Sequence, residues 1–335
     1  MERIPLTCPE CRTLLRKETD RLRCPSCERT YSRTLGIPNL CDSQIEVSPV
    51  ERAVVTELQK VFSTATLEEL NQRRLSTYQD SLDIDKGLRE HYAEYISSLH
   101  TRGQKFYRMF RDAIAETLAS PSPGVAMDIG CGTGAGLLPM AHEFTHVVGL
   151  DVRMSSLIVA KKLIESHGIS NVTLIQGSAL CMPFPNSLFD YVTAINVLEH
   201  IFEPATMLEE VHRILAKGGA FVGDSRNRFD LFFPEPHARL RWIGFLPRKW
   251  MPRYVRWRRG ISYETTHLLS YGDLRRAMTA TFRPGEWDIV IPRISTYGFP
   301  KWLESLVVRG TECGFLRGLL IRLSPTHLAL AHRSD

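Results

Sequence analysis

The chain has 335 residues and a net charge of +5; 43% of its residues are hydrophobic and 24% are charged. This length predicts two to three folding units, and the composition is that of a globular protein rather than a disordered or fibrous one. No apolar run approaches the roughly 20 residues of a membrane-spanning helix, and the first twelve residues, MERIPLTCPECR, lack the apolar core of a secretory signal. We therefore expect a cytoplasmic protein whose eight cysteines form no disulfide framework.

The first unit predicted by the sequence is a zinc ribbon over residues 1–41. Two Cys-x-x-Cys pairs flank the stretch TLLRKETDRLR, which alternates like a β-hairpin around a polar turn. Each pair can present two thiolates from a tight turn, and four thiolates complete a closed tetrahedral site for a structural Zn²⁺, which stabilises so small a core. A ribbon that has lost its metal is the alternative. The four expected ligands are Cys8, Cys11, Cys24 and Cys27.

The segment after the second pair, YSRTLGIPNL (residues 31–40), resembles the end of a known small ribbon. That ribbon is the zinc-binding activator subunit of some methyltransferases, whose bacterial relatives also close with a Gly-Ile-Pro segment. Because a four-thiolate site leaves no position for water, the zinc is expected to be structural and not catalytic.

Residues 42–120 are expected to form a helical linker or lid. Apolar residues recur there at three- and four-residue spacing, as in helices with one buried face. The Ser-Pro-Ser-Pro-Gly cluster at residues 120–124 then breaks the helical pattern and introduces the first strand of the next unit.

Residues 121–224 alternate between strands and helices, which predicts an α/β unit with a parallel, Rossmann-like sheet covered by helices. Its central motif is VAMDIGCGTG (residues 125–134), an apolar strand that ends in Asp128 and a glycine turn before a helix. The glycines allow a sharp turn and leave room for a ligand against the backbone. On this motif alone an NAD site stays open, although Ala135 stands where the dinucleotide pattern has its last glycine.

Taken together, the motifs of residues 125–219 resemble those of class I S-adenosylmethionine (SAM) dependent methyltransferases. DIGCGTG resembles their first motif, and LEEVHRILAKGG (residues 208–219) resembles the helix and Gly-Gly turn before their fifth strand. Asp151 ends the second strand, where a carboxylate can accept two hydrogen bonds from a ribose diol. Ser178 follows the third strand, where the family usually has Asp beside the adenine.

The resemblance implies a SAM site on the first four strands. Arg102, in the helical segment, could pair with the methionine carboxylate of SAM, or it could be a solvated charge on a helix. The alternative for Asp151 is that it caps the N-terminus of a helix. The alternative for Asp128 is that it is a buried carboxylate whose hydrogen bonds are satisfied within the protein. The expected cofactor-binding residues are Asp128, Gly130, Cys131, Gly132, Thr133, Gly134, Asp151, Val152, Ser178, Ala179, Asn196 and Arg102.

Candidate catalytic residues follow the fourth and fifth strands. The sulfonium of SAM already activates the methyl group, so the protein mainly aligns the acceptor, and a base helps only an acceptor that carries a proton to lose. The Glu-His pair at 199–200 also occurs in ubiquinone-type O-methyltransferases, in which an upstream acid helps to hold a metal. Asn196 occupies that position here, so we expect no catalytic metal. The candidates are Glu199, His200, His237 and His267; for His200 the alternative is capping or packing under the following helix.

The last unit, residues 225–335, is expected to complete the sheet and to carry the acceptor-binding insertion. Between residues 239 and 259 it interleaves eight cations with five aromatic side chains and has no acid. This segment could bind RNA, lie on an anionic membrane, or cap the acceptor pocket with its arginines toward a phosphorylated or acidic substrate. Pro247 and Pro252 exclude one long amphipathic helix.

The leading functional hypothesis is an O-methyltransferase whose acceptor is a small molecule, a lipid-linked intermediate or a glycan. The acceptor could be phosphorylated. The enzyme could act at the inner face of the membrane. The basic segment resembles inserts in uncharacterised bacterial methyltransferases, which are similar to enzymes that act on glycans, lipids or secondary metabolites. The alternative is an rRNA or tRNA methyltransferase that binds RNA through the ribbon and the basic segment. Ribosomal RNA guanine methyltransferases, however, resemble a Cys-x-x-Cys and Cys-x3-His arrangement, and no Asn-Pro-Pro-Tyr motif follows the fourth strand. A third alternative is a non-catalytic protein that retains the fold.

Overall fold

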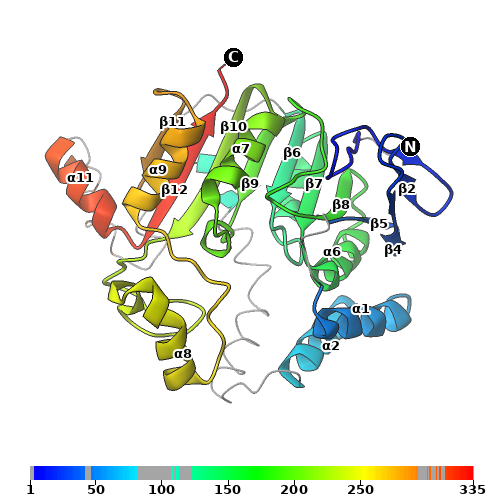
Figure 1. Cartoon of the computed structure of the whole chain (residues 1–335), viewed down its shortest axis with the longest axis horizontal. Helices are drawn as coiled ribbons and strands as arrows, with labels where there is room; N and C mark the ends of the chain where they lie inside the picture. Colours follow the sequence, from blue (N-terminus) through cyan, green and yellow to red (C-terminus); the bar gives the residue numbers. More distant parts are fainter. Residues whose placement is uncertain are drawn as a thin grey trace.

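The fold is organised around a mixed β-sheet, which in the described part of the chain has nine strands in the order β11-β12-β10-β9-β6-β7-β8-β5-β4 (Figure 1). Strands β5 to β10 run parallel where they are neighbours, and β12 lies antiparallel between β10 and β11. The computed structural model describes residues 4–41, 47–80, 107–108, 111–112, 123–292, 300, 302, 307, 309–310 and 314–334.

The central strands are β6 (Val125–Ile129), β7 (His146–Asp151), β8 (Val172–Gly177), β9 (Phe189–Ala194), β10 (Leu215–Arg226), β11 (Trp287–Val290) and β12 (Thr326–His332). The helices that cover them are α5 (Leu137–Glu143), α6 (Met154–Ser166), α7 (Pro204–Ile214), α9 (Tyr271–Thr281) and α11 (Gly314–Leu323). The predicted Rossmann-like sheet flanked by helices is thereby confirmed.

Alternating side chains of the strands fill two apolar layers. In β6, Ala126 packs into the layer that contains α5 and α6, whereas Met127 packs into the layer that contains α7 and α9. This alternation is the expected consequence of the two-residue period of a strand. Because both faces of β6 are covered, its residues are apolar except for Asp128. The sheet is therefore a rigid platform whose strand ends can position a site.

Two helices from the predicted helical segment lie against the layer that contains α5 and α6. Helices α1 (Pro49–Val61) and α2 (Leu67–Asp80) pack on each other and on α6, with Val54 and Leu58 fully buried. Ser48 caps α1 by accepting a hydrogen bond from the backbone N–H of Glu51 at 3.1 Å. The described part of residues 42–120 is thus helical, as the apolar spacing predicted.

The N-terminal unit is a small sheet of three short strands, β1 (Arg16–Lys17), β2 (Leu22–Arg23) and β3 (Thr30–Tyr31), and β1 and β2 form the predicted hairpin. The chain then continues through β4 (Arg33–Thr34) into β5 (Ile37–Leu40), which pairs with β8 through Asn39 and Leu40. The central sheet therefore runs across the boundary drawn at residue 41, while the domain limits themselves stay a prediction.

The basic aromatic segment folds into a module with a small core of its own. Short 3₁₀ turns at Ile243–Phe245 (η2) and Arg248–Trp250 (η3) precede helix α8 (Met251–Arg259), in whose first turn Pro252 lies. The prolines thus divide the segment, as predicted. Its buried core residues are Ala238, Leu240, Ile243, Met251, Val255, Tyr263 and Leu268.

None of the helices in the described ranges combines the length and the hydropathy that crossing a bilayer requires.

Candidate active site

The glycine turn after β6 lies where the chain order of the sheet reverses, between β6 and β9. Ligands of open α/β sheets bind at such a switch point, outside the carboxyl ends of the strands. Gly130, Gly132 and Gly134 have φ values of +66°, +52° and +88°, which side chains rarely adopt. A Cβ atom at Gly130 would lie 2.4 Å from Cγ2 of Val197, whereas a Cβ at Gly132 would meet no atom within 4 Å. The turn is therefore packed on one side and open at Gly132.

Asp128, which precedes the turn, is a buried carboxylate that is 4% exposed. Its Oδ1 accepts a hydrogen bond from Oγ1 of Thr193 at 2.7 Å, and its Oδ2 lies close to Gly136, where a Cβ would come within 2.9 Å. Burial raises the pKa of Asp128 to about 7. Because Thr193 of β9 donates this hydrogen bond, it does not show whether Asp128 contacts the cofactor, and that role stays a prediction.

Asp151, at the end of β7, faces the same turn. Its Oδ2 accepts a hydrogen bond from the backbone N–H of Gly132 at 2.9 Å, and its Oδ1 accepts one from the N–H of Arg153 at 2.8 Å. The N-cap of α6 is Arg153, so Asp151 does not cap that helix. Burial raises the pKa of Asp151. The carboxylate is thus held beside the open glycine, as a group that accepts from ribose hydroxyls would have to be.

Exposed apolar side chains follow β7 and β8. Val152 is 43% exposed and Leu180 is 38% exposed, on the loops after two neighbouring parallel strands. Ser178 is buried, and its Oγ accepts a hydrogen bond from the N–H of Leu180 at 3.1 Å, so this hydroxyl shapes its own loop. Ala179 is also buried. Sequence reasoning did not single out Leu180, although its place in an adenine-bordering loop was a usable signal.

Three other predicted cofactor-binding residues, Cys131, Thr133 and Asn196, lie in or near the turn. Cys131 is buried, and a Cβ at Gly149 would lie 2.9 Å from its sulfur, so its thiol packs against β7. Thr133 is half-buried. Asn196 has a φ of +54°, and its N–H donates to Oδ1 of Asp224 at 2.6 Å. Asn and Asp tolerate this left-handed conformation better than most residues.

Two predicted catalytic histidines meet beside the glycine turn. The rings of His200 and His237 lie 4.9 Å apart, edge to face. His200 belongs to the 3₁₀ turn Leu198–His200 (η1), which directly follows the Val197 that Gly130 contacts. His200 Nδ1 lies 3.2 Å from the carbonyl oxygen of Thr265, which can only accept, so Nδ1 carries the proton. Burial, with the charge of His237, lowers the pKa of His200 to about 4.

Glu235 orients His237. Oε1 of Glu235 lies 2.6 Å from Nδ1 of His237, and its Oε2 accepts from the N–H of Ala238 at 2.6 Å. Burial alone would lower the pKa of His237, but the hydrogen bond and the charge of Glu235 raise it above its ordinary value. Of the two histidines, His237 is therefore the stronger base, and its Nε2 is the nitrogen not bound by Glu235.

Buried acids surround this pair. Glu199 is 2% exposed, and its Oε2 has no hydrogen-bond partner in the described part of the chain. Burial and the neighbouring Asp224 raise the pKa of Glu199 to about 8. Tyr263 is also buried, and its pKa is raised by burial and by the charges of Glu235 and Glu199.

His267 is joined to this cluster through its backbone. The N–H of His267 donates to the carbonyl of Glu199 at 2.6 Å, while its ring lies against Phe202, with 5.5 Å between the centroids. Arg102 lies outside the described residues. The same helical segment supplies Arg74, which sequence reasoning missed; it is buried, its charge acts on Asp151, and burial lowers its pKa to about 10.

A small hollow, with room for about one water molecule, lies close to the histidine pair, although neither histidine lines it. It is lined by Glu235, by the aromatic side chains of Phe233 and Trp242, and by Arg226, among others. The carboxylate that holds His237 thus lies at the edge of this hollow.

Residues 122–239, which contain the glycine turn, Asp151 and both histidines, match the family model described as "Methyltransferase domain". These residues form a methyltransferase domain. A demethylmenaquinone methyltransferase of Bacillus licheniformis is 34% identical over 121 residues, which are 35% of this chain and 51% of the relative. One of Geobacillus kaustophilus is 36% identical over 100 residues, 29% of this chain and 43% of that protein. The chain spans about half the length of the curated relatives that it matches.

Solved structures of methyltransferases are also similar to the chain. Phosphoethanolamine N-methyltransferase 2 of Haemonchus contortus, in complex with S-adenosyl-L-methionine, is 17% identical with a TM-score of 0.45, covering 67% of this chain and 52% of its own. Geranyl diphosphate C-methyltransferase of Streptomyces coelicolor is 18% identical with a TM-score of 0.45, covering 67% and 74%.

The four N-terminal cysteines converge beside the methyltransferase domain. Sγ of Cys8 lies 3.6 Å from that of Cys27, and Sγ of Cys11 lies 3.3 Å from that of Cys24; all four lie within 4.8 Å of one another. Four sulfurs about 2.3 Å from a tetrahedral zinc ion would be about 3.8 Å apart, so the spacing fits that metal. Oη of Tyr31 lies 3.0 Å from the sulfur of Cys8 and can donate to it.

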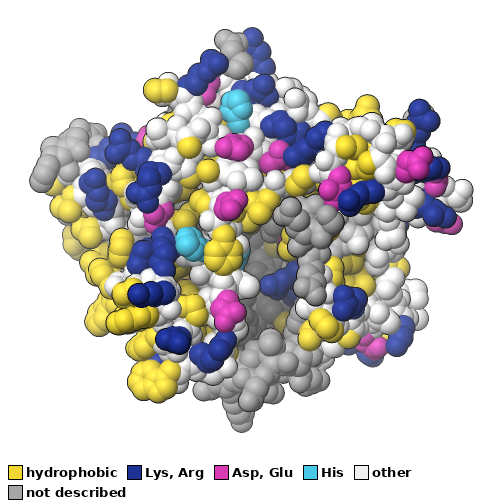
Figure 2. Space-filling view, viewed as in Figure 1, with side chains coloured by type: hydrophobic (Ala, Val, Ile, Leu, Met, Phe, Trp, Pro, Cys, Tyr) yellow, Lys and Arg dark blue, Asp and Glu magenta, His cyan; other side chains and the backbone are white. Residues whose placement is uncertain are grey.

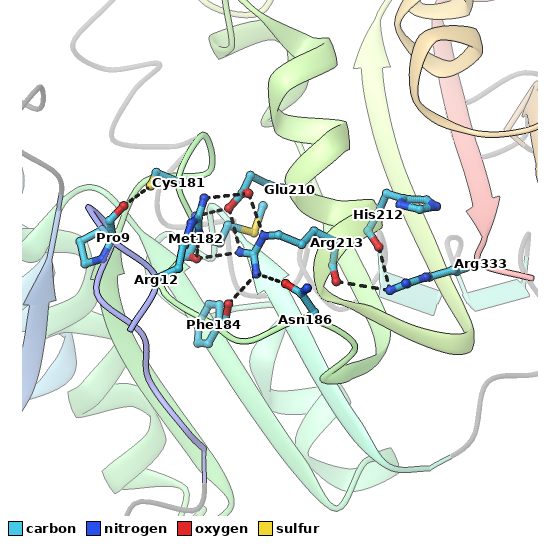
Figure 3. A network of polar contacts seen from close by, with 10 residues as sticks. All are labelled: Pro9, Arg12, Cys181, Met182, Phe184, Asn186, Glu210, His212, Arg213 and Arg333. Atoms are coloured by element: carbon cyan, nitrogen blue, oxygen red, sulfur yellow. Dashed lines mark hydrogen bonds and ion pairs between the residues drawn. The ribbon is translucent and has the colours of Figure 1, made fainter. Parts of the chain in front are cut away.

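The cysteine unit is fixed to the loop that follows β8 (Figure 3). Arg12, next to Cys11, donates to the carbonyl of Met182 at 2.6 Å and to Oε1 of Glu210 at 2.8 Å. The thiol of Cys181 donates to the carbonyl of Pro9 at 2.7 Å. Since this loop begins at Ser178, the ribbon holds the segment that would border the adenine.

Proposed function

We propose that the chain is a SAM-dependent methyltransferase whose acceptor loses a proton as it is methylated. The observation that carries this proposal is the contact between the glycine turn and the segment of the histidine pair. Gly130 packs on Val197, three residues before His200, so an open backbone site and a pair of bases share one edge of the sheet. The methyltransferase domain match and the curated relatives support the reaction class.

On the cofactor side, the open face of Gly132 would lie against the ligand, and Asp151 would accept from its ribose hydroxyls. Asp151 is already aligned, because the N–H groups of Gly132 and Arg153 hold its two oxygens. Val152 and Leu180 would enclose the adenine between apolar surfaces, which suits an aromatic base.

On the acceptor side, His237 would be the general base. The bound sulfonium supplies an activated methyl group, so the residues of this chain have to align the acceptor and take up its proton. Glu235 fixes the ring of His237 and leaves Nε2 to accept that proton, and the charge of Glu235 stabilises the imidazolium that results. A hydroxyl of a small molecule, a lipid-linked intermediate or a glycan is the acceptor that this arrangement serves best.

The N-terminal unit would complete the enzyme as a structural zinc ribbon. Its four sulfurs leave no coordination position for a substrate, so the ion would stabilise the fold of residues 1–41 and take no part in the reaction.

Calorimetric titration with SAM tests the cofactor site. Replacing Gly132 by Ala should weaken SAM binding roughly tenfold to a hundredfold, because the added methyl group occupies the open face of the turn. The matched control is Gly168→Ala, which has a φ of +65° and the same open surroundings but lies after α6. Both variants carry a similar backbone strain, so an equal loss of affinity in the two would contradict the proposed site.

Transfer of labelled methyl groups from SAM to cell extract, fractionated into RNA, lipids and soluble metabolites, tests the acceptor. Label in lipids or soluble metabolites, released by treatments that cleave methyl ethers, is the expected result. Label confined to RNA would contradict the proposed acceptor while leaving the methyltransferase reaction intact.

A further inference from the structure

The module around α8 exposes an unusual number of large apolar side chains. Trp257 is 75% exposed, Trp242 is 59% exposed and Trp250 is 55% exposed. The adjoining loop and turn expose four more apolar residues, Phe229, Leu231, Phe232 and Phe245. Exposed apolar residues that gather in one place mark interaction surfaces more often than scattered ones do.

Cations lie among these side chains. Arg239, Arg241, Lys249, Arg253, Arg256 and Arg258 are exposed. Arg256 pairs with Glu264, at 2.9 Å, and Arg258 lies over the ring of Trp257. Lys249 and Arg253 form no ion pair with an acid of the described ranges, and residues 237–260 contain no Asp or Glu. The surface is therefore both apolar and positively charged.

A second element extends the apolar surface. Helix α11 exposes Leu316, Leu319 and Leu323, whose spacing of three and four residues places them on one side of the helix. Figure 2 shows hydrophobic side chains along the left and lower left margins, where Figure 1 places α11 and α8, with Lys and Arg interspersed. Two elements far apart in the sequence thus present the same chemistry at one side of the molecule.

We propose that the surface formed by α8, its preceding turns and the exposed side of α11 docks on an anionic phospholipid membrane. Tryptophan is favoured at the boundary between headgroups and acyl chains, and arginine and lysine are attracted to anionic headgroups. The exposed aliphatic side chains favour a bilayer over RNA, because leucine offers a nucleic acid neither a stacking plane nor a charge. Charge complementarity and apolar area thus select the same partner.

Docking would bring the hollow beside His237 to the membrane. Trp242 belongs to the docking surface, and Trp242 and Glu235 both line that hollow. The base proposed above would then lie close to the membrane surface, a consequence that rests on the proposed function, whereas the docking itself does not.

Co-sedimentation of the full chain with vesicles tests the docking. Without SAM or acceptor, we expect binding to phosphatidylcholine vesicles that contain phosphatidylglycerol and little binding to phosphatidylcholine alone. The charge reversal Lys249→Glu with Arg253→Glu should weaken binding roughly tenfold to a hundredfold. The control, Arg16→Glu with Lys17→Glu on exposed β1, makes the same change of net charge on the ribbon and should bind almost like the native chain.

A second pair of variants separates the apolar contribution. Trp250→Ala with Trp257→Ala should reduce vesicle binding and remove most of the blue shift in tryptophan fluorescence, whereas Leu14→Ala, an exposed apolar residue of the ribbon, should change neither. Exposed positions such as these cost little stability when changed.

Three results would overturn the proposal: absence of binding to anionic vesicles, an equal loss of binding in the control variants, or binding of an RNA oligonucleotide or of a second copy of the chain in place of vesicles. None of these results depends on SAM. A failure of docking is therefore distinguishable from a failure of the methyltransferase assignment, which the calorimetric titration measures.

Discussion

Replacing His237 by Gln should lower kcat roughly 10²- to 10⁴-fold, the contribution that a positioned general base usually makes. The amide cannot accept the acceptor's proton, while the geometry of the loop at Glu235 is largely kept, because Ala238 still donates to Glu235. SAM affinity should stay within about twofold, since His237 lies on the acceptor side. His142→Gln, an exposed histidine on α5, is the matched control. A native kcat in His237→Gln, measured with the extract fraction that takes up label from SAM, would exclude His237 as the base.

The pH dependence of kcat tests the pairing of Glu235 with His237. Glu235 raises the pKa of His237, so the base is protonated, and inactive, at low pH, and the rate should rise as the pH passes above this raised pKa. Glu235→Gln removes the charge that favours the imidazolium, so the pKa of His237 should fall and the rising limb should move to lower pH. A profile that loses amplitude but does not move would mean that Glu235 only supports the loop.

The second large effect is expected from loss of the metal. Removing zinc with a chelator, or by Cys24→Ser, should unfold the ribbon, because metal binding supplies the folding free energy of such units, about 10–16 kcal/mol in zinc-finger peptides. Unfolding would release Arg12 from Met182 and Pro9 from Cys181, so the loop that begins at Ser178 would keep its contacts to Glu210 and Arg213 but lose those to the ribbon. SAM affinity should therefore fall, by roughly tenfold for each 1.4 kcal/mol of lost loop order.

Two further variants separate the effect of losing the metal from the effect of losing the contacts between the ribbon and the loop after β8. Cys41→Ser changes a cysteine outside the cluster and should keep zinc content, melting temperature and SAM affinity. Arg12→Ala should keep the zinc but weaken SAM binding, because it removes the contacts to Met182 and Glu210 alone. If metal-free protein bound SAM as well as the native protein, the ribbon would have no influence on the cofactor loop.

The sequence was sufficient for features that depend on local pattern. Alternation and apolar runs predicted the sheet, and the spacing of the cysteines predicted four sulfurs that do converge. The glycine turn was recognisable because positive φ values leave few residue types possible. Pro247 and Pro252 likewise divided the basic segment where the structure divides it.

Features that arise from long-range packing could not be predicted. Glu235 was one more acid in a proline-rich loop, and only the fold shows that its carboxylate holds His237. His200, His237 and His267 were all candidates, and only the fold shows that burial lowers the pKa of His200 and that the ring of His267 lies against Phe202. The burial of Arg74 near Asp151 depends on how α2 packs on α6, which no pattern in the chain reports.

The pairing of β5 with β8 has a consequence for how this protein can be cut or expressed. A fragment that begins after residue 41 would expose the outer edge of β8, whose unpaired N–H and C=O groups could recruit strands from other molecules. In the whole chain the sheet instead ends at β4, which is two residues long and carries Arg33, and short, charged edges resist such association. The ribbon would thus protect the protein from aggregation, whatever else it does.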